Sequence, residues 1–169
     1  MNDGLPRDGA GRMAQARQAR VLIVDDHETN RLLLQEHVAM NGCTPILASD
    51  GVEALHEIHA SPPDMVILDL MLPRLDGDAV LRRVRANPAF DRMPIVMISA
   101  LSDNARANRC MELGASDFIP KPFPANALDD RINQCLASAS REEQGADPFR
   151  AREFAREIVS ALGLLHLAT

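Results

Sequence analysis

The stretch that decides the fold is MVILDLMLP, residues 65–73. It begins with four apolar residues without polar alternation, a pattern typical of a strand buried on both faces of a parallel sheet. One carboxylate, Asp69, stands at the end of this run, and a turn that contains Pro73 follows. A charge at the exit of a buried strand is costly unless a cation compensates it. Because open α/β sheets keep their chemistry at the carboxyl ends of their strands, we predict that Asp69 is the reactive residue.

Four further runs have the features of short strands. They span residues 21–24, 44–48, 94–99 and 116–120. Apolar residues at helical spacing, with capping residues at the ends, predict five helices. These cover residues 28–40, 50–59, 76–86, 102–113 (begun by Ser102 or Asp103) and 124–137. Strands that alternate with helices in this way favour an α/β fold with a doubly wound parallel sheet and right-handed crossovers.

Two prolines restrict the strand order. Pro45 and Pro120 lie in the second and fifth strands, and proline is confined to sheet edges or strand ends because it cannot donate to the ladder. The flavodoxin-like order 2-1-3-4-5 meets this condition and places the first strand beside the third. Asp25 and Asp26, which follow the first strand, then converge with Asp69 at the carboxyl edge of the sheet.

Three carboxylates in one crevice repel one another, and a divalent cation removes that cost. A ligand set made only of oxygen suits Mg²⁺ or Mn²⁺. Ser99 and Lys121 stand at the ends of the fourth and fifth strands, where they can reach the oxygens of a phosphoryl group. A metal, a lysine, a hydroxyl and a nucleophilic carboxylate are the groups needed to form an aspartyl phosphate.

In this order along the chain, these residues resemble the receiver domain of bacterial two-component response regulators (the CheY-like domain). The resemblance covers about residues 20–138. It is carried by Val24-Asp25-Asp26, Asp69 with Met71 and Pro73, Gly77, Ile98-Ser99-Ala100, and residues 117–123, DFIPKPF.

The resemblance implies a role for each residue of the site. Asp69 would accept a phosphoryl group from the phosphohistidine of a sensor histidine kinase or a phosphotransfer protein. Asp26, Asp69 and the backbone carbonyl of Met71 would bind Mg²⁺, with Asp25 acting through water. Lys121, aimed by a cis bond to the following proline, would contact the phosphoryl group.

A switch pair is implied as well. Ser99 would move to bind the phosphoryl oxygen, and Phe118 would turn into the space that Ser99 leaves. Phe118 stands where the family more often has tyrosine, so one hydroxyl is absent.

Other interpretations of the same residues are weaker. Asp25 and Asp26 alone would more often cap a helix, and a lone lysine such as Lys121 is more often a solvated surface residue. A dinucleotide site needs GxGxxG after the first strand, and neither that motif nor a P-loop occurs. A haloacid-dehalogenase-like phosphatase carries DxD, whereas Met71 occupies the second position after Asp69.

Composition restricts the partners and the compartment. With a net charge of −6 and no basic run, the chain has no signature of a nucleic-acid surface. We find no signal peptide and no 18-residue apolar stretch, and therefore expect a cytoplasmic protein with no membrane contact. Three widely spaced cysteines match no metal pattern and indicate free thiols.

We expect four segments: a flexible arm over residues 1–18, the receiver over 19–138, a polar linker over 139–147, and an amphipathic helix over 148–167. Phe154, Ile158 and Leu165 lie on one stripe of that helix, which must bury against something. It could fold back on its own receiver, pair with a second chain, or begin a coiled coil that leads to an output domain.

Two functions remain open. One is a stand-alone receiver, with no enzyme activity beyond its own phosphorylation and dephosphorylation. It would form a homodimer through its C-terminal helix, or through the face built from residues 102–113, 116–120 and 124–137. The alternative is the regulatory part of a larger signalling enzyme, such as a nucleotide cyclase or a phosphatase.

Overall fold

Five parallel strands form the sheet in the order β2-β1-β3-β4-β5, which confirms the flavodoxin-like prediction. The computed structural model describes residues 17–100 and 104–145. The strands are β1 (Arg20–Val24), β2 (Thr44–Ala48), β3 (Met65–Asp69), β4 (Ile95–Ser99) and β5 (Asp117–Pro120). Pro45 and Pro120 lie in the two edge strands, where a missing N–H costs no central ladder bond.

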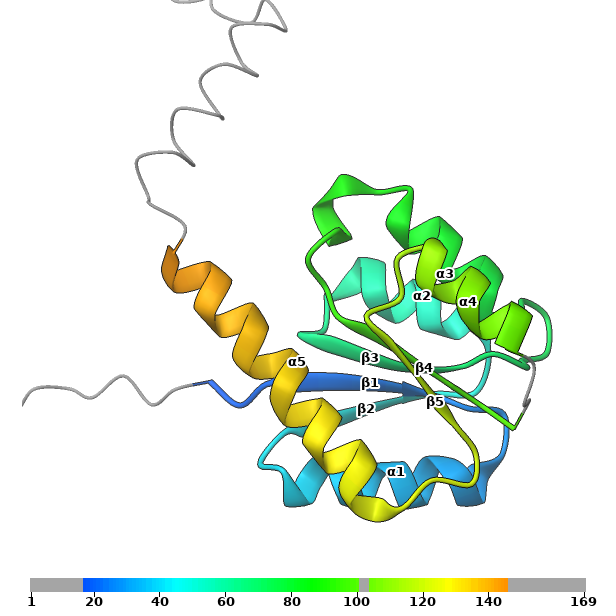
Figure 1. Cartoon of the computed structure of the whole chain (residues 1–169), viewed down its shortest axis with the longest axis horizontal. Coiled ribbons are helices and arrows are strands. Elements are labelled where there is room, and N and C mark those ends of the chain that lie inside the picture. The colour runs from blue at the N-terminus through cyan, green and yellow to red at the C-terminus, as the bar shows by residue number, and fades with distance from the viewer. Residues whose placement is uncertain (1–16, 101–103, 146–169) are drawn as a thin grey trace, which may run out of the picture.

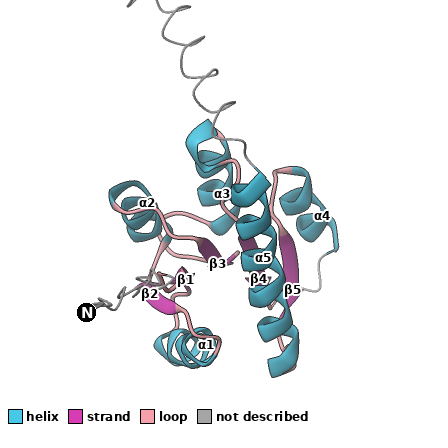
Figure 2. Cartoon of the chain, turned by 90° about the vertical axis from the view of Figure 1, so that its left-hand side faces the viewer, coloured by secondary structure: helices cyan, strands magenta, loops and turns pink. Residues whose placement is uncertain are grey.

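Helices cover both faces of this sheet. They are α1 (Glu28–Met40), α2 (Gly51–Ala60), α3 (Gly77–Arg85), the short 3₁₀ turn η1 (Pro88–Phe90), α4 (Asn104–Glu112) and α5 (Ala125–Gly145). Figures 1 and 2 show α1 and α5 on one face, and α2, α3 and α4 on the other. Five parallel strands between two layers of helices make this a doubly wound α/β fold.

Alternate residues of the strands supply two separate hydrophobic cores. In β1, Leu22 and Val24 pack toward α2 and α3, whereas Val21 and Ile23 pack toward α1 and α5. The central strands are buried on both faces, which explains why β3 reads as a continuous apolar run rather than an alternating one. The sheet is thereby held from both sides, and the residues beyond its strand ends are placed on a rigid base.

The last helix is longer than predicted. We expected it to end near Ala137 and a polar linker to occupy residues 139–147, but α5 continues to Gly145. Residues 139–144 consist of Ala, Ser, Arg, Glu and Gln, most of which are strong helix formers, and no proline interrupts them. Polarity alone therefore does not end a helix, and the predicted end of this helix near Ala137 is wrong.

Three predicted features lie outside the described residues. They are the arm as far as residue 16, the helix cap at Ser102 or Asp103, and the C-terminal helix over residues 148–167. Among the helices of the described ranges, none combines the length and the apolar composition that a membrane span requires.

Candidate functional site

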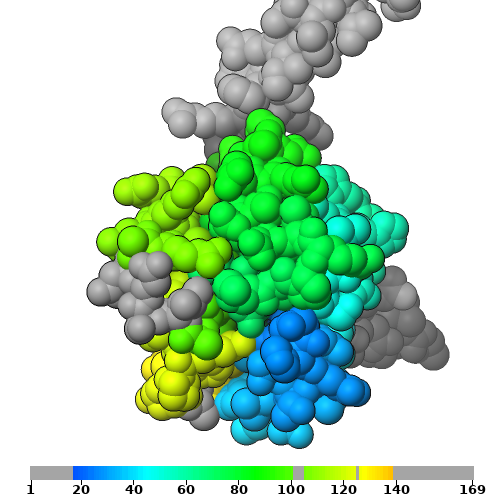
Figure 3. Space-filling view, turned by 90° about the vertical axis from the view of Figure 1, so that its right-hand side faces the viewer, coloured from blue at the N-terminus to red at the C-terminus, as the bar shows by residue number. Residues whose placement is uncertain are grey.

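The carboxyl ends of β1, β3 and β5 meet at one edge of the sheet. In Figure 3, which views this side of the molecule, the segments that follow these strands appear in blue, green and yellow. Asp25 follows β1 directly, Asp69 is the last residue of β3, and Lys121 follows β5 directly. Because parallel strands point their carboxyl ends in the same direction, three residues that are far apart in sequence become neighbours.

A lysine bridges two buried carboxylates of this edge. Lys121 Nζ donates to Asp25 Oδ2 at 2.6 Å and to Asp69 Oδ2 at 2.7 Å. The side chains of Asp25, Asp69 and Lys121 are only 1%, 9% and 19% exposed. The structure therefore brings together three of the residues that the sequence singled out, in a pocket with little access to bulk water.

The same lysine leaves the two carboxylates in different electrostatic states. Burial alone would raise the pKa of Asp25, but hydrogen bonds from Lys121, the His27 amide and the Asn30 side chain outweigh it, so this pKa is lowered. At Asp69, burial outweighs the donors and the pKa is raised. Burial opposes the charge of Lys121, yet its bonds to both carboxylates raise the pKa of the ammonium group. Asp69 is thus the less stabilised of the two anions.

Asp26 lies at the exposed rim of this pocket. Its Oδ1 is 2.7 Å from His27 Nδ1. The side-chain atoms of Asp25, Asp26 and His27 that could bind a metal all lie within 4.8 Å of one another. Among the described residues, these three form a group that could hold a metal ion. The two aspartates were predicted as metal ligands, and His27 was not.

Two further neighbours of Asp25 come from α1. Asn30 Nδ2 is 3.2 Å from both oxygens of Asp25, and Arg31 Nη1 donates to the Asp25 carbonyl at 2.7 Å. Both residues lie in the first turn of α1, so a signal existed: a helix that begins three residues after a strand-end carboxylate brings its first turn back to that carboxylate.

The loop after β3 holds the second oxygen of Asp69. The Met71 amide donates to Asp69 Oδ1 at 3.0 Å, so both oxygens of Asp69 have a donor. A Cβ at Gly77 would lie 2.2 Å from the carbonyl oxygen of Asp69, and the start of α3 can therefore approach the site only as glycine. The Met71 side chain is about half exposed, and its sulfur lies 3.4 Å from Arg106 Nη1.

The predicted switch residues lie on neighbouring strands. Ser99 ends β4 and is fully buried, and its carbonyl accepts from the Lys121 amide at 2.7 Å. Phe118 pairs with Met97 in the β4–β5 ladder and packs, half-buried, against the core between the sheet and α2, α3 and α4. The bond between Lys121 and Pro122 is cis, as the resemblance implied.

The residues present fit a hard divalent cation. Asp25, Asp26 and Asp69 offer carboxylate oxygens, and Met71 adds a backbone carbonyl in the same loop; no thiolate stands among them. Lys121 pairs with Asp25 and Asp69, and Asp26 adds a third carboxylate, so these four side chains together keep a negative charge. A cation with oxygen ligands would remove that excess.

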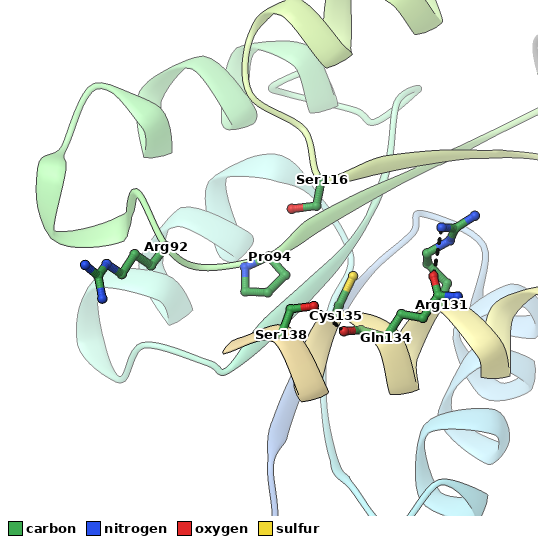
Figure 4. A pocket seen from close by; sticks show the side chains of 7 residues that line it. All are labelled: Arg92, Pro94, Ser116, Arg131, Gln134, Cys135 and Ser138. Atoms are coloured by element: carbon green, nitrogen blue, oxygen red, sulfur yellow. Dashed lines mark hydrogen bonds between the residues drawn. The ribbon is translucent and has the colours of Figure 1, made fainter. Parts of the chain in front are cut away.

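A second cavity lies at the opposite edge of the sheet. It has a volume of about 310 Å³ and is bounded by the residues just before β4 and β5 and by the second half of α5. In Figure 4, the guanidinium of Arg92 points away from the other labelled residues. Arg131 is already paired with Asp117 and donates to Gln134 at 3.1 Å. With its cations turned away or engaged, this cavity is not the candidate site.

Comparison with known proteins identifies the family of this chain. The family model of the response regulator receiver domain matches residues 21–133. The chain is 41% identical over 122 residues to the "Probable transcriptional regulator ycf27" of Guillardia theta, and 38% identical over 127 residues to the response regulator MprA of Mycobacterium ulcerans. These alignments cover 72% and 75% of this chain but 47% and 54% of the relatives. The chain therefore spans about half the length of these curated relatives.

Solved structures are similar along their whole length. The receiver domain of NtrX from Brucella abortus shares 34% sequence identity with a TM-score of 0.65, and the match covers 69% of this chain and 98% of that one. The receiver domain of the Francisella response regulator 1452 shares 28% identity with a TM-score of 0.67, over 72% and 98% of the two chains. Sequence and fold agree that this chain belongs to the response regulator receiver domain family of bacterial two-component systems.

Proposed function

We propose that Asp69 accepts a phosphoryl group from the phosphohistidine of a sensor histidine kinase or a phosphotransfer protein. The observation that carries this proposal is the Lys121 bridge, which holds Asp69 at a strand end beside a second buried carboxylate. Of the two carboxylates, Asp69 has the raised pKa and is the less stabilised anion, as a nucleophile should be.

Asp25, Asp26, Asp69 and the Met71 carbonyl would hold Mg²⁺, or Mn²⁺ in its place. Bound there, the ion would neutralise charge on the phosphoryl oxygens and on the carboxylates. We assign Asp26 and Asp69 to direct binding and Asp25 to binding through water. The exposure of Asp26 supports its assignment to direct binding, since an ion that arrives from solvent meets this carboxylate first.

The chemical step needs little from the protein beyond position and charge. A carboxylate oxygen of Asp69 attacks phosphorus, and an acyl phosphate bond forms as the P–N bond to the donor imidazole breaks. The electron pair of that bond stays on the imidazole nitrogen. Lys121, released from Asp69, contacts the phosphoryl oxygens and keeps its bond to Asp25, so its charge remains compensated. The receiver catalyses only its own phosphorylation and dephosphorylation.

Ser99 and Phe118 would report the phosphorylated state. The new group adds about −1.5 to −2 charges to an edge that is already acidic. In the proposed switch, the Ser99 hydroxyl donates to a phosphoryl oxygen, and the Phe118 ring turns into the space that this movement opens. The half-buried position of Phe118 supports the assignment, because a ring at the margin of the core can exchange between two sites at a lower cost than one at its centre.

A cavity beside the site offers a docking place for the donor protein. It has a volume of about 360 Å³ and lies between α1 and the segment after β5, with Leu33, Pro122 and Phe123 among its lining residues and Lys121 at its edge. Leu32 and Leu33, on α1, are each 51% exposed. An apolar surface of a partner could bury these side chains while presenting its phosphohistidine to Asp69.

The output is a change in protein contacts. We propose a stand-alone receiver that forms a homodimer through residues 148–167 or through the face of α4, β5 and α5. The relatives are named response or transcriptional regulators, so the alternative of a cyclase or phosphatase fragment gains no support from them. Because ycf27 is named a transcriptional regulator, our expectation of no nucleic-acid partner is restricted to the receiver itself. A cytoplasmic location is consistent with three free cysteines.

Intact-mass spectrometry tests the central proposal. The protein is incubated with acetyl phosphate and Mg²⁺, and we expect one added phosphoryl group that disappears with EDTA present or with Asp69→Asn. Asp78→Asn, which changes a half-buried aspartate of α3 that pairs with Arg82 and takes no part in the site, serves as the control and should be phosphorylated like the wild type. Absence of the added mass, or its persistence in Asp69→Asn, would overturn the proposal.

A further inference from the structure

The loop between β3 and α3 contains a turn that is unfavourable for its sequence. Arg74 has φ = 63°, and the Leu75 amide donates to the Pro73 carbonyl at 2.7 Å, so these three residues form a γ-turn with positive φ. Within the described ranges, Arg74 is the only non-glycine residue with positive φ. Such a conformation persists where the surroundings hold it, and it is concentrated at functional sites.

An ion pair holds this turn. The Arg74 guanidinium is paired with Asp50 Oδ2, across 24 residues of sequence. Asp50 is only 6% exposed and stands at the N-terminus of α2, where its Oδ1 accepts from the amides of Val52 at 2.8 Å and Glu53 at 3.0 Å. The two oxygens of Asp50 thus have separate tasks: Oδ1 caps the helix, and Oδ2 holds the loop.

The backbones of α2 and the loop also lie in direct contact. A Cβ at Gly51 would come within 2.2 Å of the Leu75 carbonyl oxygen and 2.7 Å of Val80 Cγ2. At the other end of the loop, the Gly77 amide donates to the Leu70 carbonyl at 3.0 Å. Between these fixed points lies Met71, whose amide binds Asp69 and whose carbonyl we assigned to the metal.

We propose that Asp50 and Arg74 are positioning residues for the phosphorylation site. Their ion pair fixes the loop over residues 70–76 so that the Met71 carbonyl and the Asp69 carboxylate are arranged for the cation before it arrives. This role rests on the proposed function. It gives α2, which contributes no side chain to the site, an influence on the affinity for metal.

Asp50→Asn is the decisive variant. Asparagine is as good an N-terminal cap as aspartate, so Oδ1 keeps its two helix amides. The amide nitrogen that replaces Oδ2 cannot accept from Arg74, and the ion pair is lost. We expect Mn²⁺, titrated and followed by the electron paramagnetic resonance signal of the free ion, to bind about threefold to tenfold more weakly, while the urea midpoint falls only by the modest amount that the loss of one ion pair costs.

Variants of the partner separate the ion pair from the backbone effect. Arg74→Gly removes the guanidinium but adopts positive φ without cost. We expect it to weaken Mn²⁺ binding as Asp50→Asn does, and the double variant to be no weaker than either single one, because both remove the same contact. Arg74→Lys keeps a cation and should restore part of the affinity. Arg82→Ala removes an exposed arginine of α3 and should bind like the wild type.

A measurement without metal completes the test. In the metal-free protein, the amides of Leu75 and Gly77 should exchange with solvent about tenfold faster in Asp50→Asn, since the loop opens more often. If the wild type binds Mn²⁺ and is phosphorylated, but Asp50→Asn matches it in affinity and exchange, the positioning role is wrong and the proposed function stands. A wild type that neither binds Mn²⁺ nor takes up phosphoryl groups would overturn both.

Discussion

The two edges of the sheet neutralise their charges differently. At the carboxyl edge, Asp25 and Asp69 share one lysine, and Asp26 adds a third carboxylate beside His27. At the amino edge, Asp64 has a bidentate partner in Arg17, at 2.6 and 2.9 Å, and a third donor in the Arg20 amide at 2.7 Å. A carboxylate such as Asp64, whose charge is neutralised by protein donors, has a structural role. A group of carboxylates with too few cationic partners instead indicates the edge of the sheet that binds a ligand.

A half-buried arginine near the amino edge also has fixed protein partners. Arg85 donates to the carbonyls of Gly114, Phe90 and Met93 at 2.7 to 2.8 Å, and so ties α3 to η1 and to the turn after α4. Every donor group of this side chain has a backbone partner. Lys121, in contrast, bonds to groups that must exchange partners when a phosphoryl group arrives.

The largest effect is expected for Lys121→Met. The change leaves Asp25 and Asp69 without their shared cation in a buried pocket, and phosphorylation by acetyl phosphate should slow by about a hundredfold or more. Stopped-flow or quenched-flow measurement with intact-mass detection gives the rate. Lys121→Arg, which keeps the positive charge, serves as the matched control and should retain more of the phosphorylation rate than Lys121→Met. A rate unchanged in Lys121→Met would remove the distinction between the two edges.

Arg85→Met should lower the stability of the protein and leave its rate of phosphorylation unchanged. Three backbone carbonyls lose their donor, and the free energy of unfolding should fall by about 2 to 3 kcal/mol. The rate of phosphorylation of the remaining folded protein should equal that of the wild type. Urea denaturation measures the first quantity, and Arg83→Met, at an exposed position of the same helix, is the control. A slower phosphorylation of folded Arg85→Met would show that Arg85, at the amino edge, also affects the reaction at the carboxyl edge.

A smaller effect on phosphotransfer is expected for a variant in the cavity beside the site, and it tests whether the donor protein docks there. In Leu33→Asp, a carboxylate replaces an apolar side chain that lines this cavity. We expect phosphotransfer from a histidine kinase, found by profiling a panel, to slow by about tenfold, and phosphorylation by acetyl phosphate to stay within about twofold. Met40→Asp, at the far end of α1 and fully solvated, is the control. Equal losses with both donors would mean that Leu33 supports the site itself rather than docking.

The smallest effect concerns Asp64 and pH. Burial would raise the pKa of Asp64, but the bonds from Arg17 and the Arg20 amide outweigh it and lower this pKa. A lowered pKa stabilises the folded state above the unfolded value near 4, and this stabilisation is lost as pH falls through the folded value. Asp64→Asn should therefore cost about 1 kcal/mol at pH 7 and progressively less toward pH 3, measured by urea denaturation at both pH values. A constant difference would show that the charge of Asp64 does not matter.

The sequence predicted the fold in detail because two local signals were unambiguous. Continuous apolar runs fixed the central strands, and Pro45 and Pro120 fixed the edges. Asp25, Asp69 and Lys121 could be predicted for the same reason: a parallel sheet brings the residues after its strands to one edge. The end of α5 was missed, because a polar composition does not distinguish a linker from a solvated helix.

The contacts that depend on loop conformation could not be predicted. The pairing of Asp50 with Arg74 follows from the positive φ of Arg74 and from the approach of Gly51 to Leu75, and neither is visible in the sequence. The sequence predicted a helix that begins at Asp50, and capping that helix uses one oxygen of the side chain; nothing in the local pattern indicated a task for the other.

The length of α5 has a mechanical consequence. The helix starts four residues after Lys121 and runs unbroken for 21 residues, so at 1.5 Å per residue it reaches about 30 Å from its origin. A tilt of about 10° around the amino end would carry Gly145 through about 5 Å, whereas the atoms at the pivot barely shift. A rigid rod of this kind converts an adjustment near the lysine into a displacement large enough to change what the following residues can touch.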